Sequence, residues 1–376
     1  MILKDRLRMI LNRLELFGCE NKMIDLSKLE YRLVAIGSGG EQHDLTGVTS
    51  GLNWTEAEKQ LASKITCKLA AFVNDKPITD FVSINTQLII CADTGDGFQE
   101  VMRGNVQKLN FSESNREMEV NLEAADEAIA LRQSQVDEYF TEDHSSTAIL
   151  EKILNDGDIP HTIKITDQKH SKKVYRAKYL ADIIADILKD IKEKDGGTYI
   201  VRAKGGVLEI IERGTNETIY EFSVENNVTR VSESLDASKL VTQVKICGKE
   251  TKEGRPPVEA TVDGNLELGR RTVIYHRSDK ETLDEAQKAA EKILKENDIQ
   301  RKTSFEAADL PFLRKGDLIQ LRNSLGAGRF FVKSISHNAD KASMRVELDY
   351  SKEKSEEAGF EVYQLAETAE FDSPAP

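Results

Sequence analysis

The spacing of apolar residues along the first third of the chain is typical of short β-strands separated by turns. Apolar and polar residues alternate within Met118–Leu122, so that Met118, Val120 and Leu122 share one face. The same criterion predicts earlier strands at Tyr31–Ile36, Leu52–Lys59, Lys64–Phe72, Leu88–Cys91 and Phe98–Leu109. We therefore expect an all-β domain at residues 31–130.

After Ala124 the apolar pattern is that of helices mixed with strands. Ser145–Thr147 are hydroxyl residues suited to cap a helix, and the apolar repeat behind them stops at Asn155–Gly157. Ala177–Lys192 has apolar residues at i, i+3, i+4, i+7 and i+8, which predicts an amphipathic helix. A strand and a hairpin are expected at Ile159–Ile165 and Thr198–Ile211. These elements predict a small α+β domain at residues 131–235.

Strand patterns return from Leu240 and are interrupted by one strong helix. Acidic and hydroxyl residues open this helix, and its apolar stripe runs from Leu283 to Leu294. The strands that follow are expected at Lys302–Ala307, Asp317–Arg322, Arg329–Ser336 and Met344–Asp349. We expect a second β domain with an inserted helix at residues 236–350, followed by a flexible acidic tail at residues 351–376.

The N-terminal segment needs a separate interpretation because it is both apolar and charged. Charged residues interrupt the apolar ones throughout Met1–Cys19, so the continuous core of a signal peptide is missing. The pattern predicts an amphipathic helix within residues 1–30 that packs on its own protein; docking on a partner or on a membrane surface are the alternatives. No apolar run approaches the ~20 residues that cross a bilayer, so we expect no stable membrane insertion.

The two β regions can be aligned on each other. Laying Val106–Leu122 on Val332–Leu348 without a gap matches apolar residue with apolar residue at strand positions. A glycine turn precedes both segments, and a strand that opens with Leu-Ile precedes each turn, at Leu88-Ile89 and Leu318-Ile319. Duplication of a β unit would explain this match. The alternative is that any two meanders share such an alternation.

Composition narrows the classes of function. The 376 residues include 65 acidic and 52 basic side chains, which gives a formal net charge of −13. Phosphate binding needs a basic face, so a general nucleic-acid binder is disfavoured and no sequence-specific nucleic acid is expected as a partner. The 4 cysteines include no Cys-x-x-Cys pair, which favours reduced thiols over a disulfide frame or a zinc site.

No motif supplies a catalytic, cofactor-binding or metal-binding site. Asp93-Thr94-Gly95 spells the tripeptide of aspartic proteases, but that chemistry needs a second such aspartate, and a hairpin turn is the preferred interpretation. The 6 histidines include no pair at i, i+4, and Ser145-Ser146 lacks a strand-to-helix elbow. Gln168–Lys178 is a basic patch, expected as a solvated loop and helix start, or alternatively as a surface for an acidic partner. We expect a protein that acts through surfaces and not as an enzyme.

Two segments and the order of domains resemble a known family. Tyr199–Ile210 reads Tyr-Ile-Val-x-x-x-Gly-Gly-Val-Leu-x-Ile, and Lys315–Leu321 reads Lys-Gly-Asp-Leu-Ile-x-Leu. Together with the order β, α+β, β, they resemble baseplate hub proteins of contractile phage tails. The relevant groups are PBSX-type prophage tail proteins and the late control protein D family, related to the hub of type VI secretion spikes. The resemblance covers about Tyr31–Tyr350 and excludes Met1–Glu30, which departs from the family pattern.

The resemblance implies an α+β, mainly β fold in which two similar, tail-tube-like β-barrel domains flank an α+β domain. It implies a structural hub of a phage tail or tailocin baseplate, a homotrimeric ring that joins the sixfold tail tube to the threefold central spike. The implied partners are the tail tube protein, the central spike protein, the tape-measure protein and other baseplate proteins. Such a protein assembles in the bacterial host cytoplasm and resides in the virion or tailocin particle. The family has no catalytic, cofactor or metal residues to carry over.

An alternative from another class is a tail-associated cell-wall hydrolase or carbohydrate-binding accessory. Such a protein should show a carboxylate pair in a cleft and paired aromatic residues for sugar stacking. The single tryptophan in 376 residues argues against it.

Overall fold

The computed structural model describes residues 23–24, 26–113, 118–248, 254, 256–323, 326–350 and 361–365. The chain divides into two compact units, a larger one of residues 1–231 and 304–376 and a smaller one of residues 232–303. Most of the predicted N-terminal helix lies outside the described residues. The described end of that range holds the short strand β1 (Met23–Ile24) and a helical turn at Leu26–Lys28.

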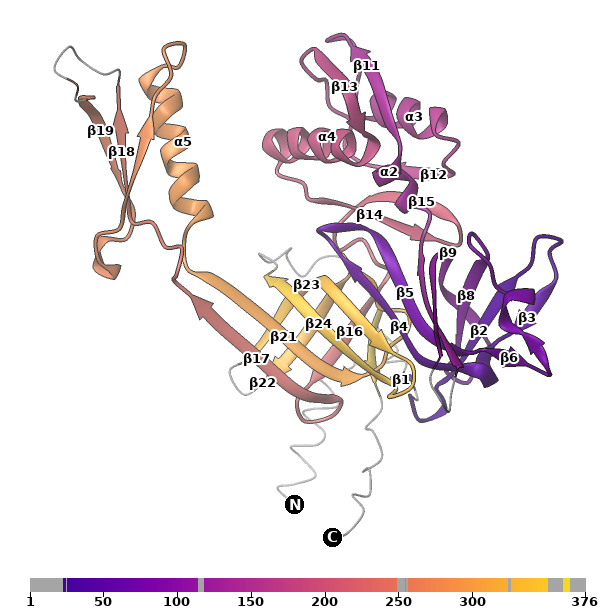
Figure 1. Cartoon of the computed structure of the whole chain (residues 1–376). Coiled ribbons are helices and arrows are strands. Elements are labelled where there is room, and N and C mark those ends of the chain that lie inside the picture. The colour runs from indigo at the N-terminus through magenta and orange to yellow at the C-terminus, as the bar shows by residue number, and fades with distance from the viewer. Residues whose placement is uncertain are drawn as a thin grey trace, which may run out of the picture. The chain divides into compact units, whose positions relative to one another are not determined.

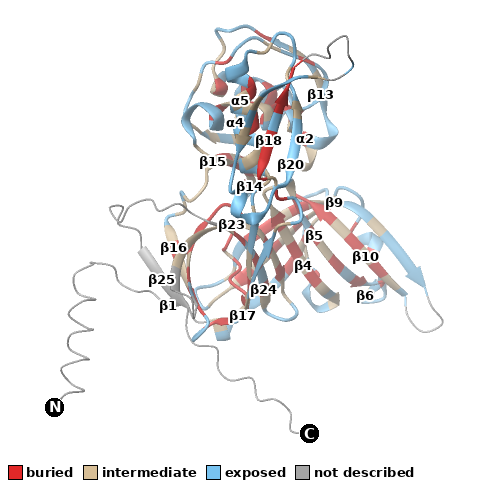
Figure 2. Ribbon diagram, turned by 90° about the vertical axis from the view of Figure 1, so that its left-hand side faces the viewer, coloured by how far each residue is buried: buried red, intermediate tan, exposed pale blue. Residues whose placement is uncertain are grey.

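The first sheet of the larger unit is antiparallel and confirms the strands predicted in this region (Figure 1). Its strands are β2 (Glu30–Ile36), β3 (Gln42–Asp44), β4 (Thr49–Ala57), β5 (Gln60–Ala70), β8 (Gln87–Asp93), β9 (Gln99–Glu113) and β10 (Met118–Ala125). They lie in the order β4-β5-β10-β9-β8-β2-β3. Buried and exposed residues alternate along β5 and β10 (Figure 2), and the buried face packs around Trp54, Leu88 and Val120. Two shorter strands, β6 (Phe72–Val73) and β7 (Lys76–Pro77), pair separately.

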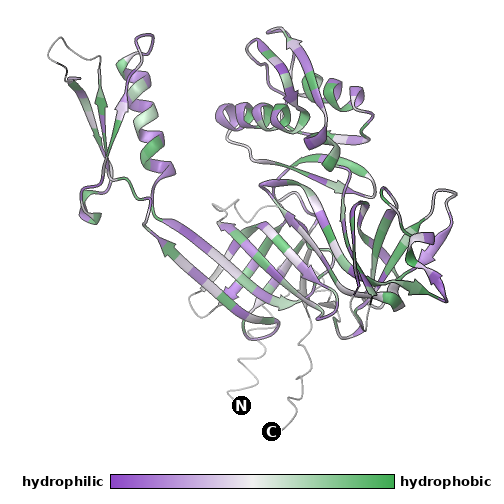
Figure 3. Ribbon diagram, in the orientation of Figure 1, coloured by the Kyte–Doolittle hydropathy of each residue, from purple (hydrophilic) through white to green (hydrophobic). Residues whose placement is uncertain are grey.

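Helices and short sheets follow within the larger unit. The elements are α2 (Ile129–Gln133), β11 (Gln135–Phe140), α3 (Ser146–Asp156), β12 (His161–Lys164), β13 (Lys173–Tyr179), α4 (Leu180–Asp195), β14 (Tyr199–Lys204) and β15 (Val207–Glu212). The apolar and polar faces of α4 are visible in Figure 3, and the helix ends at Gly196, whose φ is 79°. The loop predicted at Gln168–Lys178 is correct for residues 168–172 and wrong from Lys173 on: β13 lies there because it pairs with β11, so α4 begins at Leu180.

The second sheet of the larger unit is formed by strands that come before and after the smaller unit along the chain. Its strands are β16 (Thr218–Ser223), β17 (Val228–Asp236), β21 (Gln300–Ala308), β22 (Leu318–Asn323), β23 (Gly326–Asn338) and β24 (Ser343–Tyr350). They lie in the order β17-β21-β24-β23-β22-β16, and β25 (Glu361–Leu365) pairs in parallel with β16. Strands β16 and β17 fall within residues 131–235, but they pair with this sheet. From the predicted acidic tail, only β25 is described.

The smaller unit has a sheet and a core of its own. The strands β18 (Gln243–Cys247), β19 (Val258–Asp263) and β20 (Thr272–His276) are covered by α5 (Leu283–Glu296). This helix confirms the one predicted between the later strands. Thr282 accepts a hydrogen bond from the Glu285 amide, and the Glu285 side chain accepts one from the Thr282 amide, which closes a capping box.

The two sheets of the larger unit repeat one strand order. Each strand of the series β4-β5-β10-β9-β8-β2 has a counterpart in the series β17-β21-β24-β23-β22-β16, and counterparts also follow in the same order along the chain. One direction differs, because β2 runs antiparallel to β8 whereas β16 runs parallel to β22. In the described part of the chain both series belong to one open 15-stranded sheet, joined where β23 pairs with β4, and we call its two halves the first and the second sheet.

A β-bulge marks the same place in both sheets. Gln107 on β9 and Lys333 on β23 are the residues skipped in the pairing with the next strand, and the ungapped sequence match superposes these two residues. Beyond the bulge, the hairpin of β9 and β10 is longer than the hairpin of β23 and β24. The ungapped alignment of the two sequences is therefore wrong in β10. Leu122 corresponds to Val346 rather than to Leu348. A displacement of two residues keeps each side chain on the same face of its strand. Apolar residues therefore still align with apolar residues.

Candidate functional site: a buried ionic junction

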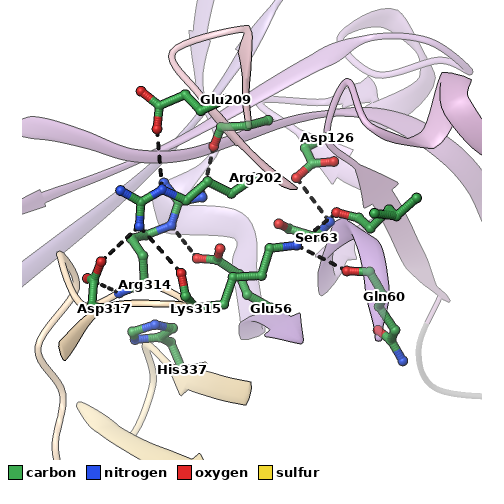
Figure 4. Close-up of polar contacts among 12 residues, drawn as sticks. Glu56, Gln60, Ser63, Asp126, Arg202, Glu209, Arg314, Lys315, Asp317 and His337 are labelled. Atoms are coloured by element: carbon green, nitrogen blue, oxygen red, sulfur yellow. Dashed lines mark hydrogen bonds and ion pairs between the residues drawn. The ribbon is translucent and has the colours of Figure 1, made fainter. Parts of the chain in front are cut away.

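The Lys-Gly-Asp motif at 315–317 lies in the turn before β22 and is buried inside the larger unit. The Lys315 ammonium, only 1% exposed, donates hydrogen bonds to the carbonyl oxygens of Gln60 (3.0 Å) and Leu61 (2.8 Å) at the start of β5. A lysine is almost never buried unless it is paired. The motif therefore ties the second sheet to the first (Figure 4).

Two arginines complete the junction. Arg314 donates to the carboxylate of Glu56 on β4, which is fully buried, and to the carbonyl oxygen of Ala203 on β14 (2.8 Å). Arg202 on β14 donates to Asp317 (2.8 Å), which also accepts from the backbone amide of Arg314 (2.9 Å). We call Glu56, Arg202, Arg314, Lys315 and Asp317 the ionic junction. It joins both sheets and the β14–β15 hairpin at one point.

Gly316, in the middle of the motif, is required by both conformation and space. Its φ is +84°, a region that side chains rarely adopt, and a Cβ atom there would collide with Ile200 of β14. Its carbonyl accepts a hydrogen bond from the amide of Gly214 at 2.8 Å. The glycine lets the turn pass directly under the hairpin.

Burial and ionic partners pull the pKa values of the junction in opposite directions. Desolvation acts to raise the pKa of Glu56, but the charge and hydrogen bond of Arg314, helped by Lys315, lower it by more, so this pKa lies below its ordinary value. Desolvation dominates at Asp317, whose pKa is raised although Arg202 opposes the shift. Desolvation likewise lowers the pKa of Lys315. Charges at this depth are costly unless paired, so the members of the junction depend on one another.

An aromatic cluster lies beside the junction and shares strand β4 with it (Figure 4). His337 on β23 stacks on Trp54 of β4 with ring centroids 4.5 Å apart, and its Nδ1 lies 2.6 Å from a carboxylate oxygen of Asp309. The other oxygen of Asp309 accepts a hydrogen bond from the Tyr31 hydroxyl (2.5 Å). Burial, followed by the Asp309 charge, raises the pKa of Tyr31. This cluster links β2, β4 and β23 through their side chains.

Two hollows of the larger unit border these clusters. One of ≈ 540 Å³ has Arg202, Arg314 and Asp317 in its lining, and another of ≈ 820 Å³ has Asp309 in its lining. The charged groups named here are already engaged with one another, so a charged ligand would have to break the junction in order to bind them.

A chain of side chains in the α+β region has the order of a catalytic triad. Ser146 Oγ lies 2.7 Å from His170 Nε2, and His170 Nδ1 lies 3.0 Å from Asp190. Ser146 is 0% exposed, and its hydroxyl also contacts the carbonyl of Gln168 (3.1 Å). No substrate can reach this oxygen, so the three residues clamp the start of α3 to α4. The sequence analysis missed this contact because the three residues lie far apart along the chain.

The remaining motifs behave as turn or core residues. Asp93 accepts hydrogen bonds from the amides of Gly95 (2.6 Å) and Gly97 (2.9 Å), which confirms the hairpin turn. Burial raises the pKa of the Cys67 thiol to about 12, so this cysteine is a poor nucleophile. Within the described ranges, no three His, Cys, Asp or Glu side chains gather as metal ligands. None of the helices described is long and apolar enough to cross a membrane.

Three of the six basic side chains in the patch at 168–178 contact acidic residues of α4. Lys173 contacts Asp186 (2.8 Å) and Asp190 (2.7 Å), and Lys178 lies 3.5 Å from Asp182. His170 is buried against Asp190 as described above. Lys178 and Asp182 are spaced i, i+4 in the sequence, but the contacts of Lys173 could not be predicted because only the fold brings β13 against α4.

Solved structures with this fold include tail proteins and a PdpA–VgrG complex. The 43 kDa tail protein of prophage MuSo2 from Shewanella oneidensis matches with a TM-score of 0.62 and 14% identity, over 85% of this chain and 98% of that one. A tail protein from Neisseria meningitidis MC58 matches with a TM-score of 0.60 and 12% identity, over 85% and 96%. A Francisella PdpA–VgrG complex matches with a TM-score of 0.52 and 11% identity, over 89% of this chain and 54% of that one. The resemblance to phage tail proteins is thus confirmed at the level of the fold.

The chain is therefore a mainly β protein with the fold of phage tail proteins. It belongs to the YQBQ-like family, whose model matches residues 52–351. No curated protein sequence matches it.

Proposed function

We propose that this chain is the structural hub of a contractile phage tail or tailocin baseplate, a homotrimeric ring that joins the sixfold tail tube to the threefold central spike. The observation that carries the proposal is the repeated strand order of the two sheets within one chain. Three copies of such a chain offer six similar surfaces to a sixfold partner, while the whole chain repeats three times. The shared fold with prophage tail proteins supports the same role.

In this proposal two tail-tube-like barrels at residues 31–130 and 236–350 flank the α+β domain at 131–235. The first sheet belongs to the first barrel, whereas the second barrel also takes in β16 and β17 and carries the smaller unit as an insertion. Residues 1–30 and 351–376 are additions to this frame. The ionic junction fixes both sheets to the β14–β15 hairpin. A protein that transmits force between the tail tube and the spike needs such a rigid connection. Because each buried charge of the junction needs its partner, the junction favours one relative position of the two sheets and the hairpin over other positions.

The proposed partners are the tail tube protein, the central spike protein, the tape-measure protein and other baseplate proteins. The protein would assemble in the bacterial host cytoplasm and then reside in the virion or tailocin particle. The proposed role uses no catalysis, cofactor or metal, and it involves no sequence-specific nucleic acid and no stable membrane insertion.

The wall-hydrolase alternative has one observation in its favour, the Ser146–His170–Asp190 order. Because Ser146 Oγ is buried and bonded on both sides, we assign it a clamping role. Incubation of the purified chain with peptidoglycan should release no soluble fragments. Release that disappears in Ser146→Ala, with the fold retained, would restore the hydrolase.

Tail particles from a bacterium that carries this gene provide the main test. Antibodies against the chain should label one end of the tube, and cryo-electron microscopy should show a ring of three copies between the tube and the spike. A chain that is absent from purified particles, or that lies away from the tube–spike junction, would overturn the proposal.

A further inference from the structure

One strand edge joins the two sheets inside each chain. Strand β23 is longer than its neighbour β22, and the rest of that edge, Ser334–Asn338, pairs antiparallel with Asn53–Ala57 of β4. This contact buries Ile335 and His337, and His337 stacks on Trp54 of β4. The second sheet is thus continued by a strand of the first.

Among the described strands, none pairs with the equivalent edge of the first sheet. By the bulge at Gln107, residues 108–112 of β9 correspond to 334–338 of β23. Strand β8 pairs with β9 only as far as Asn105, so in the described part of the chain this stretch pairs on one side only, with β10. Unpaired strand edges readily accept a further strand.

The side chains on this edge show the same asymmetry. Phe111 corresponds to His337, yet Phe111 is 52% exposed and His337 is 0% exposed. Phe111 faces the same side as the buried Val120, with which it pairs. The apolar face of the first sheet therefore extends beyond the residues that its own core buries. A strand from another chain could cover this extension.

Strand β17, the counterpart of β4 in the second sheet, also has a free edge among the described strands. Strand β17 holds in the second sheet the place that β4 holds in the first, and among the described strands it pairs only with β21. Most of its residues are exposed, and Leu235 is 67% exposed. We propose that β17 of one copy pairs with residues 108–112 of β9 in a second copy, in the way that β4 pairs with β23 within one chain.

This inference rests on the proposed ring and specifies the contact that closes it. The two edges are different surfaces, so each copy uses β9 toward one neighbour and β17 toward the other. Such a heterologous contact generates a ring when the rotation closes. Sheets would then alternate around the ring, with the β4–β23 contact within each chain and the β17–β9 contact between chains.

The test uses the full chain and two variants, each with one edge disabled. Phe111→Asp places a charge on the β9 edge, and Leu235→Asp places one on β17. Phe72→Asp is the matched control, because Phe72 is also an exposed aromatic residue (57%) of the same region but lies off the edge. Emission of the single tryptophan and the urea midpoint show that each variant is folded.

Analytical ultracentrifugation then measures mass. The wild type and Phe72→Asp should form trimers, each edge variant alone should remain monomeric, and an equal mixture of the two edge variants should give one-to-one dimers, because only one good contact is left. If both edge variants still form trimers, the ring stands and this edge pairing is overturned. A wild-type chain that stays monomeric at high concentration also overturns the edge pairing, whereas the tail role is judged separately by the particles.

Discussion

Removing Arg314 should destabilise the larger unit strongly, because it leaves a buried charge without its partner. Glu56 is 1% exposed, and Arg314 is the ionic partner that donates a hydrogen bond to its carboxylate. Arg314→Met also leaves the carbonyl of Ala203 without its side-chain donor. Breaking a buried pair by removing one partner costs about 3–5 kcal/mol, so we expect the free energy of unfolding to fall by that amount.

Urea unfolding followed by tryptophan emission measures this change directly. Trp54 is the single tryptophan of the chain and lies on β4, close to Glu56. The double variant Arg314→Met, Glu56→Met should lose at least about 1 kcal/mol less than the sum of the two single variants, since it removes both charges together.

A matched control and a refuting result complete this design. Lys68→Met breaks the exposed Lys68–Glu119 pair, whose side chains are 52% and 40% exposed, and should leave the urea midpoint unchanged. A loss below about 1 kcal/mol for Arg314→Met, or additive effects in the double variant, would refute the view that the junction acts as one unit.

Three further predictions concern other parts of the chain. Gly316→Ala should lower the free energy of unfolding by about 1–3 kcal/mol, because its Cβ collides with Ile200; an unchanged thermal midpoint would contradict the packing. Burial acts to raise the pKa of Asp190, but the hydrogen bonds from Lys173 and His170 lower this pKa by more. The pKa of Asp190 in the folded protein therefore lies below the ~3.9 of the unfolded chain. The stability that the ionised carboxylate contributes is complete at neutral pH and is lost as the pH falls through the folded pKa. Asp190→Asn should therefore flatten the stability curve below about pH 4, and an unchanged acid slope would count against it. Thr282→Ala removes the capping box of α5 and should speed amide exchange in its first turn, whereas equal exchange rates would show that the cap is idle.

Local sequence pattern was enough to predict most strands and helices. The alternation at Val120 and Leu122, the hydroxyl cap at Ser145 and the apolar repeat of Ala177–Lys192 each depend on residues that are neighbours in the chain. The prediction of a loop at Gln168–Lys178 was wrong from Lys173 on, where β13 begins. Pairing with β11 and ionic contacts to α4 made this segment a strand, and neither partner can be inferred from the segment itself.

The ionic junction shows what only the tertiary structure decided. The Lys315–Asp317 motif was visible, and Glu56 on the inward face of an apolar strand was a signal that the sequence analysis did not use. Arg314 contacts Glu56 across 258 positions of sequence. Whether a buried charge is tolerated depends on the partner that the fold brings to it, and chain neighbours carry no information about that partner.

The same distinction applies to the duplication. The sequence by itself determined the apolar faces of the strands, because a strand alternates whatever it pairs with. The tertiary structure decided the register, the two-residue correction in β10 and the pairing of β23 with β4. These depend on which edges meet, and edges meet through contacts distant in the chain. In the part of the chain that the structure describes, one edge of β9 therefore has no partner strand, even though its sequence resembles that of its paired counterpart.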